Sequence, residues 1–153
     1  MWKPIDDAGG GAACGPYVHE RKIRFGHSDA AGIAYTVRFF DFAMEAIEGW
    51  FEQVAGTPWY VINTELGYGT PFVHIEMDIK APLRPGDHLA CRVLVKETGR
   101  SSIRFGVDGF DGDDNLVFVS QWVCVLADNR AMKSIPIPDD LAARIAQYRR
   151  CCP

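Results

Sequence analysis

The chain has 153 residues, of which 48% are hydrophobic and 24% charged, and its formal net charge at pH 7 is −4. This length suits one globular domain, because two hydrophobic cores in so short a chain would both be small. The acidic balance argues against the broad basic face of a nucleic-acid-binding protein, and no apolar run reaches the roughly 20 residues that cross a bilayer. We therefore expect a cytoplasmic protein that binds neither nucleic acid nor membrane.

The N-terminal segment is rich in Gly, Ala and Pro and has no apolar signal core. Residues 1–16 are therefore expected to form a flexible tail before a single domain at residues 17–150. The chain contains five cysteines but no Cys-x-x-Cys pair, which argues against a zinc or redox site. Cys91 and Cys124 lie in alternating apolar segments, where a reduced, buried cysteine is usual. We expect no metal.

The domain begins with a strand pattern that is followed by a helix pattern. Tyr17 to Phe25 alternates as a short strand, with Ile23 and Phe25 on one face, and a loop of small residues, GHSDAAGIAY, follows. Val37 to Val54 then carries bulky apolar residues at helical spacings of three, four and seven. Additional phenylalanines outside that stripe predict a helix that is wrapped on several sides: Phe40, Phe42 and Phe51.

The second half of the chain alternates as strands, after a loop at residues 57–69 that has room for a helical turn. Short turns such as RPGD and TGRSS separate the strands and predict hairpins. The expected strands are Pro71–Ala81, His88–Glu97, Ile103–Phe110 and Leu116–Ala127. The last of these is apolar on both faces, so we expect it to be central or at a subunit interface. Pro138 to Tyr148 is predicted to form a short terminal helix.

This order of elements predicts an α+β domain. A curved antiparallel β-sheet wrapped around the long helix is the simplest arrangement that buries the helix on several sides. The free edges of such a sheet favour dimerisation edge to edge.

The loop before the helix is the most unusual stretch, because an acid, Asp29, lies among small residues just ahead of a helix N-terminus. The first amides of a helix lack internal acceptors, so they can polarise a carbonyl and stabilise an oxyanion. A neighbouring carboxylate can attack that carbonyl or deprotonate a water molecule. Thioester hydrolysis needs no more than this, although the spacing alone is equally typical of an Asp that caps a turn or a helix.

The segment FGHSDAAGIAYTVRFFDF resembles the opening of the 4-hydroxybenzoyl-CoA thioesterase family, in which an acidic loop of the form Asp-x-x-Gly-Ile/Val-x-Tyr/Trp precedes an aromatic-rich helix. The matching residues are Asp29, Gly32, Ile33, Tyr35 and Phe39. The likeness continues through GTPFV at residues 69–73, PLRPGD at 82–87 and VKETGRSS at 95–102, and covers roughly Val18 to Ala127.

The resemblance implies a hotdog fold, in which a curved antiparallel sheet surrounds a central helix. It also implies a dimer with its active sites at the subunit interface, often paired further into a homotetramer. The family's catalytic acid falls on Asp29, and its carbonyl-polarising amide falls near Tyr35 or Thr36. The implied activity is hydrolysis of an acyl-CoA to a free acid and CoA; coenzyme A is part of the substrate, and no cofactor is implied.

Substrate contacts are expected from the helix side of the loop, the GTPFV segment and a CoA-binding hairpin at residues 98–102. The expected contact residues are His27, Gly32, Ile33, Phe39, Thr70, Pro71, Phe72, His74, Lys96, Arg100, Ser101 and Ser102. The hairpin departs from the family pattern, because only Arg100 is basic where some relatives carry several basic residues. An acyl slot lined by Phe39, Phe40 and Phe72 would suit an aryl group such as 4-hydroxybenzoyl or benzoyl, or a short to medium aliphatic chain.

Other assignments remain open from the sequence. Glu45 on the helix is the rival catalytic acid, because another hotdog thioesterase group uses a helical Glu. Arg130 and Lys133 are further candidates for holding the CoA phosphates. A hotdog hydratase or dehydratase is a second possible function, although no His lies on the helix to serve it. A non-enzymatic acyl-CoA-binding protein is a third, and it would bind ligand without turnover.

Overall fold

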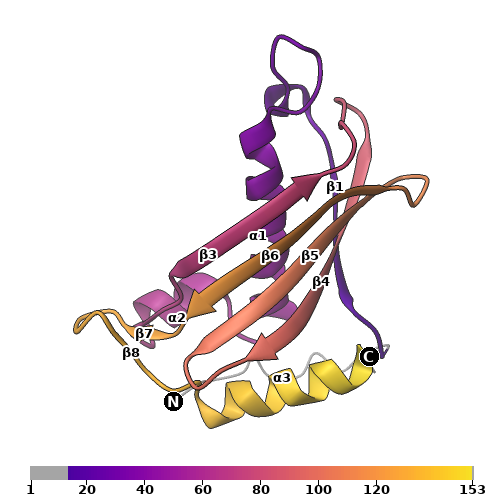
Figure 1. The fold of residues 1–153 in the computed structure, drawn as a ribbon. Helices are drawn as coiled ribbons and strands as arrows, with labels where there is room; N and C mark the ends of the chain where they lie inside the picture. The colour runs from indigo at the N-terminus through magenta and orange to yellow at the C-terminus, as the bar shows by residue number, and fades with distance from the viewer. Residues whose placement is uncertain (1–13, 153) are drawn as a thin grey trace.

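The computed structural model describes residues 14–152 and has the α+β architecture predicted from the sequence (Figure 1). One antiparallel five-stranded sheet dominates, with the strand order β1-β4-β5-β6-β3. Its strands are β1 (Tyr17–Lys22), β3 (Phe72–Ile79), β4 (His88–Thr98), β5 (Ser102–Asp111) and β6 (Leu116–Val125). Hairpins join β4, β5 and β6, whereas β3 crosses to the far edge of the sheet.

The long helix α1 (Thr36–Gln53) lies along the sheet (Figure 1) and contacts β1, β4 and β5. Its predicted apolar stripe is buried, and side chains on either side of the stripe are buried too. The buried residues are Phe39, Phe42, Ala43, Ala46, Ile47, Trp50 and Phe51. Burial on several sides confirms the prediction of a wrapped helix, and the phenylalanines and Trp50 supply most of the aromatic contacts of the core.

Strand β6 is central, between β5 and β3, which confirms the prediction drawn from its two apolar faces. Strand β3 is an edge strand and contains an irregularity after Phe72, so Val73 bulges out and is 63% exposed. Beyond the bulge, Ile75 and Ile79 pair with the buried residues Trp122 and Phe118, so they face the helix side of the sheet. Both are nevertheless partly exposed, because the sheet ends here.

Smaller elements gather at the end of the sheet that carries the β4–β5 hairpin (Figure 1). Helix α2 (Trp59–Thr64) fills the predicted loop, and β2 (Tyr68–Gly69), β7 (Ala127–Asp128) and β8 (Lys133–Ser134) form a short second sheet that the sequence did not predict. Helix α3 (Asp139–Cys151) packs against β4, and its Tyr148 contacts Trp50 of α1 with ring centroids 5.8 Å apart.

The prediction for the first strand is wrong at its end. The strand stops at Lys22, and Phe25 begins a 3-10 turn, Phe25–His27, with its side chain 85% exposed. Ile23 is buried as predicted. The chain turns here because the Ile23 amide donates to Asp87 and the Ile23 carbonyl accepts from Gly86, which ends the ladder with β4.

Three cysteines are free thiols, of which Cys152 is half-buried, and two form a disulfide. Cys91 and Cys124 are buried free thiols, as predicted; burial raises the pKa of each to about 12. Cys14 and Cys151 form a disulfide that the sequence did not predict. Most of the predicted N-terminal tail, residues 1–13, lies outside the described residues.

Candidate active site

The loop that carries Asp29 is a tight turn that is held by hydrogen bonds within its own backbone. Ser28 and Ala34 form an isolated antiparallel bridge. Inside it the Asp29 amide donates to the Ile33 carbonyl at 3.1 Å, and the Gly32 amide donates back to the Asp29 carbonyl at 3.0 Å. Gly32 has φ +75°, a conformation that residues with a Cβ rarely adopt. The glycine of the motif is therefore required by the backbone of the turn.

The Asp29 side chain is exposed at the surface of this turn. One carboxylate oxygen accepts a hydrogen bond from the Ala31 amide at 2.8 Å, which orients the group. Among residues 14–152, no basic side chain forms an ion pair with Asp29, and its second oxygen has no donor. The structure therefore holds a carboxylate in a defined direction with one oxygen open to a ligand.

At the start of α1, some backbone amides already donate a hydrogen bond within the chain and others are free to donate to a ligand. The Tyr35 amide donates to the His27 carbonyl at 2.8 Å, and the Arg38 amide donates to the Tyr35 carbonyl at 2.8 Å. In the described part of the chain, the Thr36 amide has no acceptor, and Tyr35 gives the helix no side-chain cap. Of the two amides predicted to polarise a carbonyl, Tyr35's is thus occupied, and Thr36's remains free at the positive end of the helix.

An aromatic row runs from α1 to the β3 edge. Phe40 and Phe72 both contact the buried Trp122, with ring centroids 6.0 and 5.4 Å apart, and Phe72 also meets Trp59 at 5.8 Å. Phe39 is only 3% exposed and packs into the core, so it lies apart from this row. Sequence reasoning missed Trp122, although its place in a strand apolar on both faces was a usable signal.

The GTPFV residues lie on different faces. Thr70 is buried and accepts a hydrogen bond from the Trp59 indole, while Pro71 is exposed. His74 pairs with Val123, on the face of the sheet opposite α1, and its imidazole is 3.5 Å from the Glu76 carboxylate. His74 therefore does not share a face with Phe72.

The predicted CoA hairpin lies far from Asp29 within one chain. Lys22 pairs with His88 at the start of β4, so the loop that follows β1 sits at that end of the sheet. Residues 98–102 join β4 to β5 at the other end, about 30 Å away along the strands. Arg100 is exposed there, and Ser101 and Ser102 are half-buried. Lys96 runs across the backbone of Gly106 on the outer face of the sheet.

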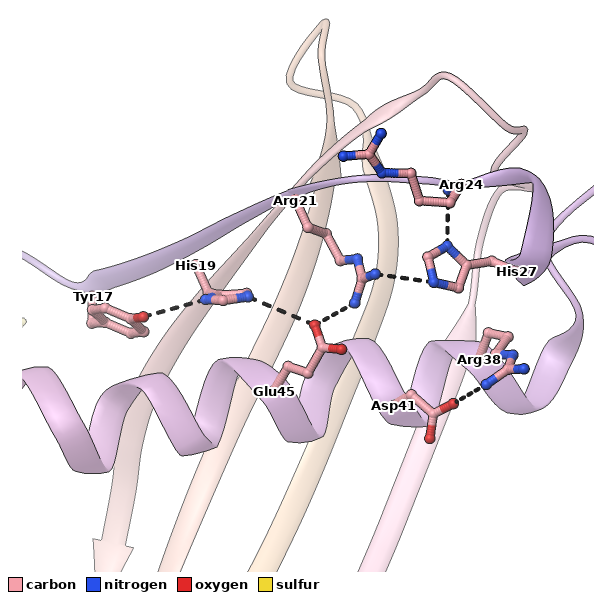
Figure 2. Close-up of polar contacts among 8 residues, drawn as sticks. All are labelled: Tyr17, His19, Arg21, Arg24, His27, Arg38, Asp41 and Glu45. Atoms are coloured by element: carbon pink, nitrogen blue, oxygen red, sulfur yellow. Dashed lines mark hydrogen bonds and ion pairs between the residues drawn. The ribbon is translucent and has the colours of Figure 1, made fainter. Parts of the chain in front are cut away.

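A polar cluster lies between β1 and α1, beside the start of the loop (Figure 2). Arg21 forms an ion pair with Glu45 and stacks over Phe42, with its guanidinium carbon 4.4 Å from the ring centroid. The His27 ring reaches into the same cluster, 3.1 Å from an Arg21 nitrogen. These side chains line a cleft of about 250 Å³ together with Arg38, Asp41, Met44 and Glu48. Glu45, the rival acid, is thus held in an ion pair by Arg21.

The part of the chain that the structure describes has neither a candidate metal site nor a candidate membrane-spanning helix. Residues 14–152 contain no group of three His, Cys, Asp or Glu side chains close enough to hold a metal ion. No helix among them is both long and apolar enough to cross a bilayer.

Comparison with known proteins places the chain in a family. Residues 23–145 match the model of the Thioesterase-like superfamily. A 1,4-dihydroxy-2-naphthoyl-CoA hydrolase of Synechococcus elongatus is 27% identical over 126 residues, which cover 82% of this chain and 91% of that protein. A thioesterase-superfamily structure from Jannaschia sp. CCS1 is 36% identical, with a TM-score of 0.80 over 95% of this chain and 96% of that one. The structure of a gentisyl-coenzyme A thioesterase, BH1999, is 23% identical, with a TM-score of 0.76 over 85% of this chain and 99% of that one.

These matches correct the family resemblance in one respect. They lie in the broader superfamily, and the curated relative is named for a naphthoyl-CoA substrate, not for 4-hydroxybenzoyl-CoA. The fold prediction is confirmed, since the curved antiparallel sheet around α1 is shared with these thioesterases. The chain belongs to the Thioesterase-like superfamily and is an acyl-CoA thioesterase of the hotdog fold.

Proposed function

We propose that this protein hydrolyses an aromatic acyl-CoA, with Asp29 as nucleophile or general base and the Thr36 amide as the group that polarises the carbonyl. The observation that carries the proposal is the oriented Asp29 carboxylate, whose free oxygen lies in the turn that leads into an uncapped helix N-terminus. The aromatic row of Phe40, Phe72 and Trp122 supports an aryl group as the acyl part. 4-Hydroxybenzoyl, benzoyl, gentisyl and dihydroxynaphthoyl thioesters are the candidate substrates.

The reaction needs only groups that this chain supplies. The Asp29 carboxylate attacks the thioester carbonyl carbon, or removes a proton from an attacking water molecule, and negative charge develops on the carbonyl oxygen. A helix N-terminal amide donating to that oxygen stabilises the charge. The carbon–sulfur bond then breaks, CoA leaves as a thiolate, and water supplies the oxygen of the free acid.

A second copy of the chain is part of the proposal. The CoA hairpin and Asp29 lie at opposite ends of one sheet, so one chain cannot hold both ends of the same substrate through them. Antiparallel pairing of the β3 edges of two chains would bring the hairpin end of one chain to the Asp29 end of the other. The partly exposed Val73, Ile75 and Ile79 support β3 as that edge. We therefore propose a homodimer, paired further into a dimer of dimers.

The test is a thiol-release assay on a panel of 4-hydroxybenzoyl-, benzoyl-, gentisyl-, dihydroxynaphthoyl-, acetyl-, hexanoyl- and palmitoyl-CoA. We expect an aromatic member to give the highest kcat/KM and Asp29→Asn to lower kcat by about 10²–10⁴-fold, the usual loss for a principal acid–base group. Asp113→Asn, an exposed turn residue with no side-chain partner among residues 14–152, is the matched control and should keep full activity.

Each other outcome has a definite meaning. Equal activity of wild type and Asp29→Asn would move the catalytic role to Glu45, which Glu45→Gln then tests. Preference for palmitoyl- or hexanoyl-CoA would refute the aryl assignment. Hydration of crotonyl-CoA, or tight binding of acyl-CoA without thiol release, would replace the hydrolase proposal with one of the two alternatives.

A further inference from the structure

His27 anchors the catalytic loop in three directions. Its carbonyl accepts the Tyr35 amide at 2.8 Å, which ties the two ends of the loop together. Its Nδ1 faces the Arg24 amide at 2.8 Å. The edge of its ring packs against Phe42 of α1, with centroids 5.2 Å apart and planes at 84°. Asp29 is two residues further on, within the loop whose two ends the Tyr35–His27 hydrogen bond joins.

Both ring nitrogens of His27 face hydrogen-bond donors (Figure 2). Nδ1 faces the Arg24 amide, and Nε2 faces a guanidinium nitrogen of Arg21 at 3.1 Å. A neutral imidazole has one nitrogen that accepts, whereas an imidazolium has none. The neutral ring therefore accepts the Arg24 amide at Nδ1, and a second proton on the ring would remove that acceptor.

The environment of His27 also favours the neutral ring. Burial, then the Arg21 and Arg38 guanidinium groups, lower the pKa of His27 below its usual 6.5, and Glu45 and Asp41 of α1 partly offset this. Arg21 has little freedom to move away, because it is only 15% exposed, paired with Glu45 and stacked on Phe42. Protonation would thus place a cation against the guanidinium of Arg21, which is already held in place.

We propose that His27 is a positioning residue: its neutral ring holds the Asp29 loop against α1, and its protonation releases the loop and lowers the rate of hydrolysis in mildly acidic solution. This inference rests on the proposed function for its effect on rate, but the anchoring itself is a property of the fold. His27 acts through Asp29 and Tyr35 and need not touch the substrate.

The kinetic test compares kcat and KM from pH 5 to 8 for wild type, His27→Asn and His27→Ala. Asn keeps an oxygen in the place of Nδ1 that can accept from the Arg24 amide, and it does not titrate in this range. We expect the wild-type kcat to fall about tenfold for each pH unit below an apparent pKa under 6.5. His27→Asn should keep most of the kcat at pH 8 and lose this acid limb, whereas His27→Ala should lose activity at every pH. His19 lies 3.8 Å from the Glu45 carboxylate of the same cluster (Figure 2), and His19→Asn should retain the wild-type profile.

A second measurement does not depend on activity. Amide hydrogen exchange of residues 26–36, corrected for the intrinsic rate at each pH, should show protection that falls below pH 6.5 in wild type but not in His27→Asn. The same acid limb in both proteins, or exchange that neither pH nor His27→Ala changes, would overturn the proposal. If wild type hydrolyses no thioester but loses loop protection at low pH, the anchoring role of His27 is supported and the proposed function fails instead.

Discussion

A buried hydrogen-bond chain in β6 gives a sharp test of how this core is held together. The Trp122 indole donates to the Ser120 hydroxyl at 2.9 Å, and the hydroxyl donates to the Val107 carbonyl of β5 at 2.7 Å. Trp122 is fully buried, and Ser120 is 5% exposed. Because Trp122 also supports Phe40 and Phe72, this chain positions the aromatic row.

The perturbation is Ser120→Ala, which removes the hydroxyl and leaves the indole N–H buried without an acceptor. Leaving one buried neutral donor unsatisfied costs about 1–3 kcal/mol. For a domain of this size, each kcal/mol shifts the Tm by about 2–4 °C. The midpoint of that range, about 2 kcal/mol, therefore corresponds to a Tm lower by about 4–8 °C.

The assay is urea denaturation and thermal unfolding of wild type, Ser120→Ala and the exposed control Ser134→Ala, all at one protein concentration because association would shift the Tm. Ser134→Ala should stay within about 0.5 kcal/mol of wild type. A loss below about 0.5 kcal/mol for Ser120→Ala would refute the argument. So would an equal loss in a Trp122→Phe background, where no indole donor remains to be orphaned.

Three further predictions concern packing, cross-linking and pH. Gly109→Ala should lower the free energy of unfolding by about 1–3 kcal/mol in urea, because its Cβ would overlap the ring of the fully buried Phe118. Reduction of the Cys14–Cys151 disulfide, which spans 137 residues, should cost about 2–4 kcal/mol in the same assay. Because the pKa of His27 is lowered in the folded state, the unfolded chain binds its proton first as the pH falls. The free energy of unfolding of wild type relative to His27→Asn should therefore be constant above about pH 6.5 and decrease as the pH falls towards the lowered pKa.

Each of these has a matched control. Gly112→Ala has its nearest neighbour, the His88 Cβ, at 3.7 Å and should be nearly neutral. Cys152→Ser leaves the disulfide intact, so its stability should still respond to reductant. Equal stability of oxidised and reduced protein, or of wild type and Gly109→Ala, would contradict the packing and cross-linking predictions. A His19→Asn variant with the same pH dependence as His27→Asn would contradict the assignment to His27.

The periodicity of the sequence was sufficient to predict α1, the strands β4 to β6 and the burial of their inward faces, because alternation and helical spacing record which side of an element avoids water. The same local information located the Asp29 loop, since glycines and other small residues are typical of a tight turn; the φ of +75° at Gly32 agrees with it. Local periodicity failed at Phe25. This apolar residue is in register with Ile23 but is exposed, because the hydrogen bonds of Ile23 with Gly86 and Asp87 end the strand.

Only the tertiary structure decided which distant residues meet. Periodicity does not specify strand partners, so the placement of β3 at the far edge and the separation of the CoA hairpin from Asp29 came from the observed pairing. The contact of Arg21 with Glu45 and His27 likewise arises because the edge strand β1 lies along α1. Long-range pairing depends on how whole faces pack together, and the spacing of residues along the chain does not record it.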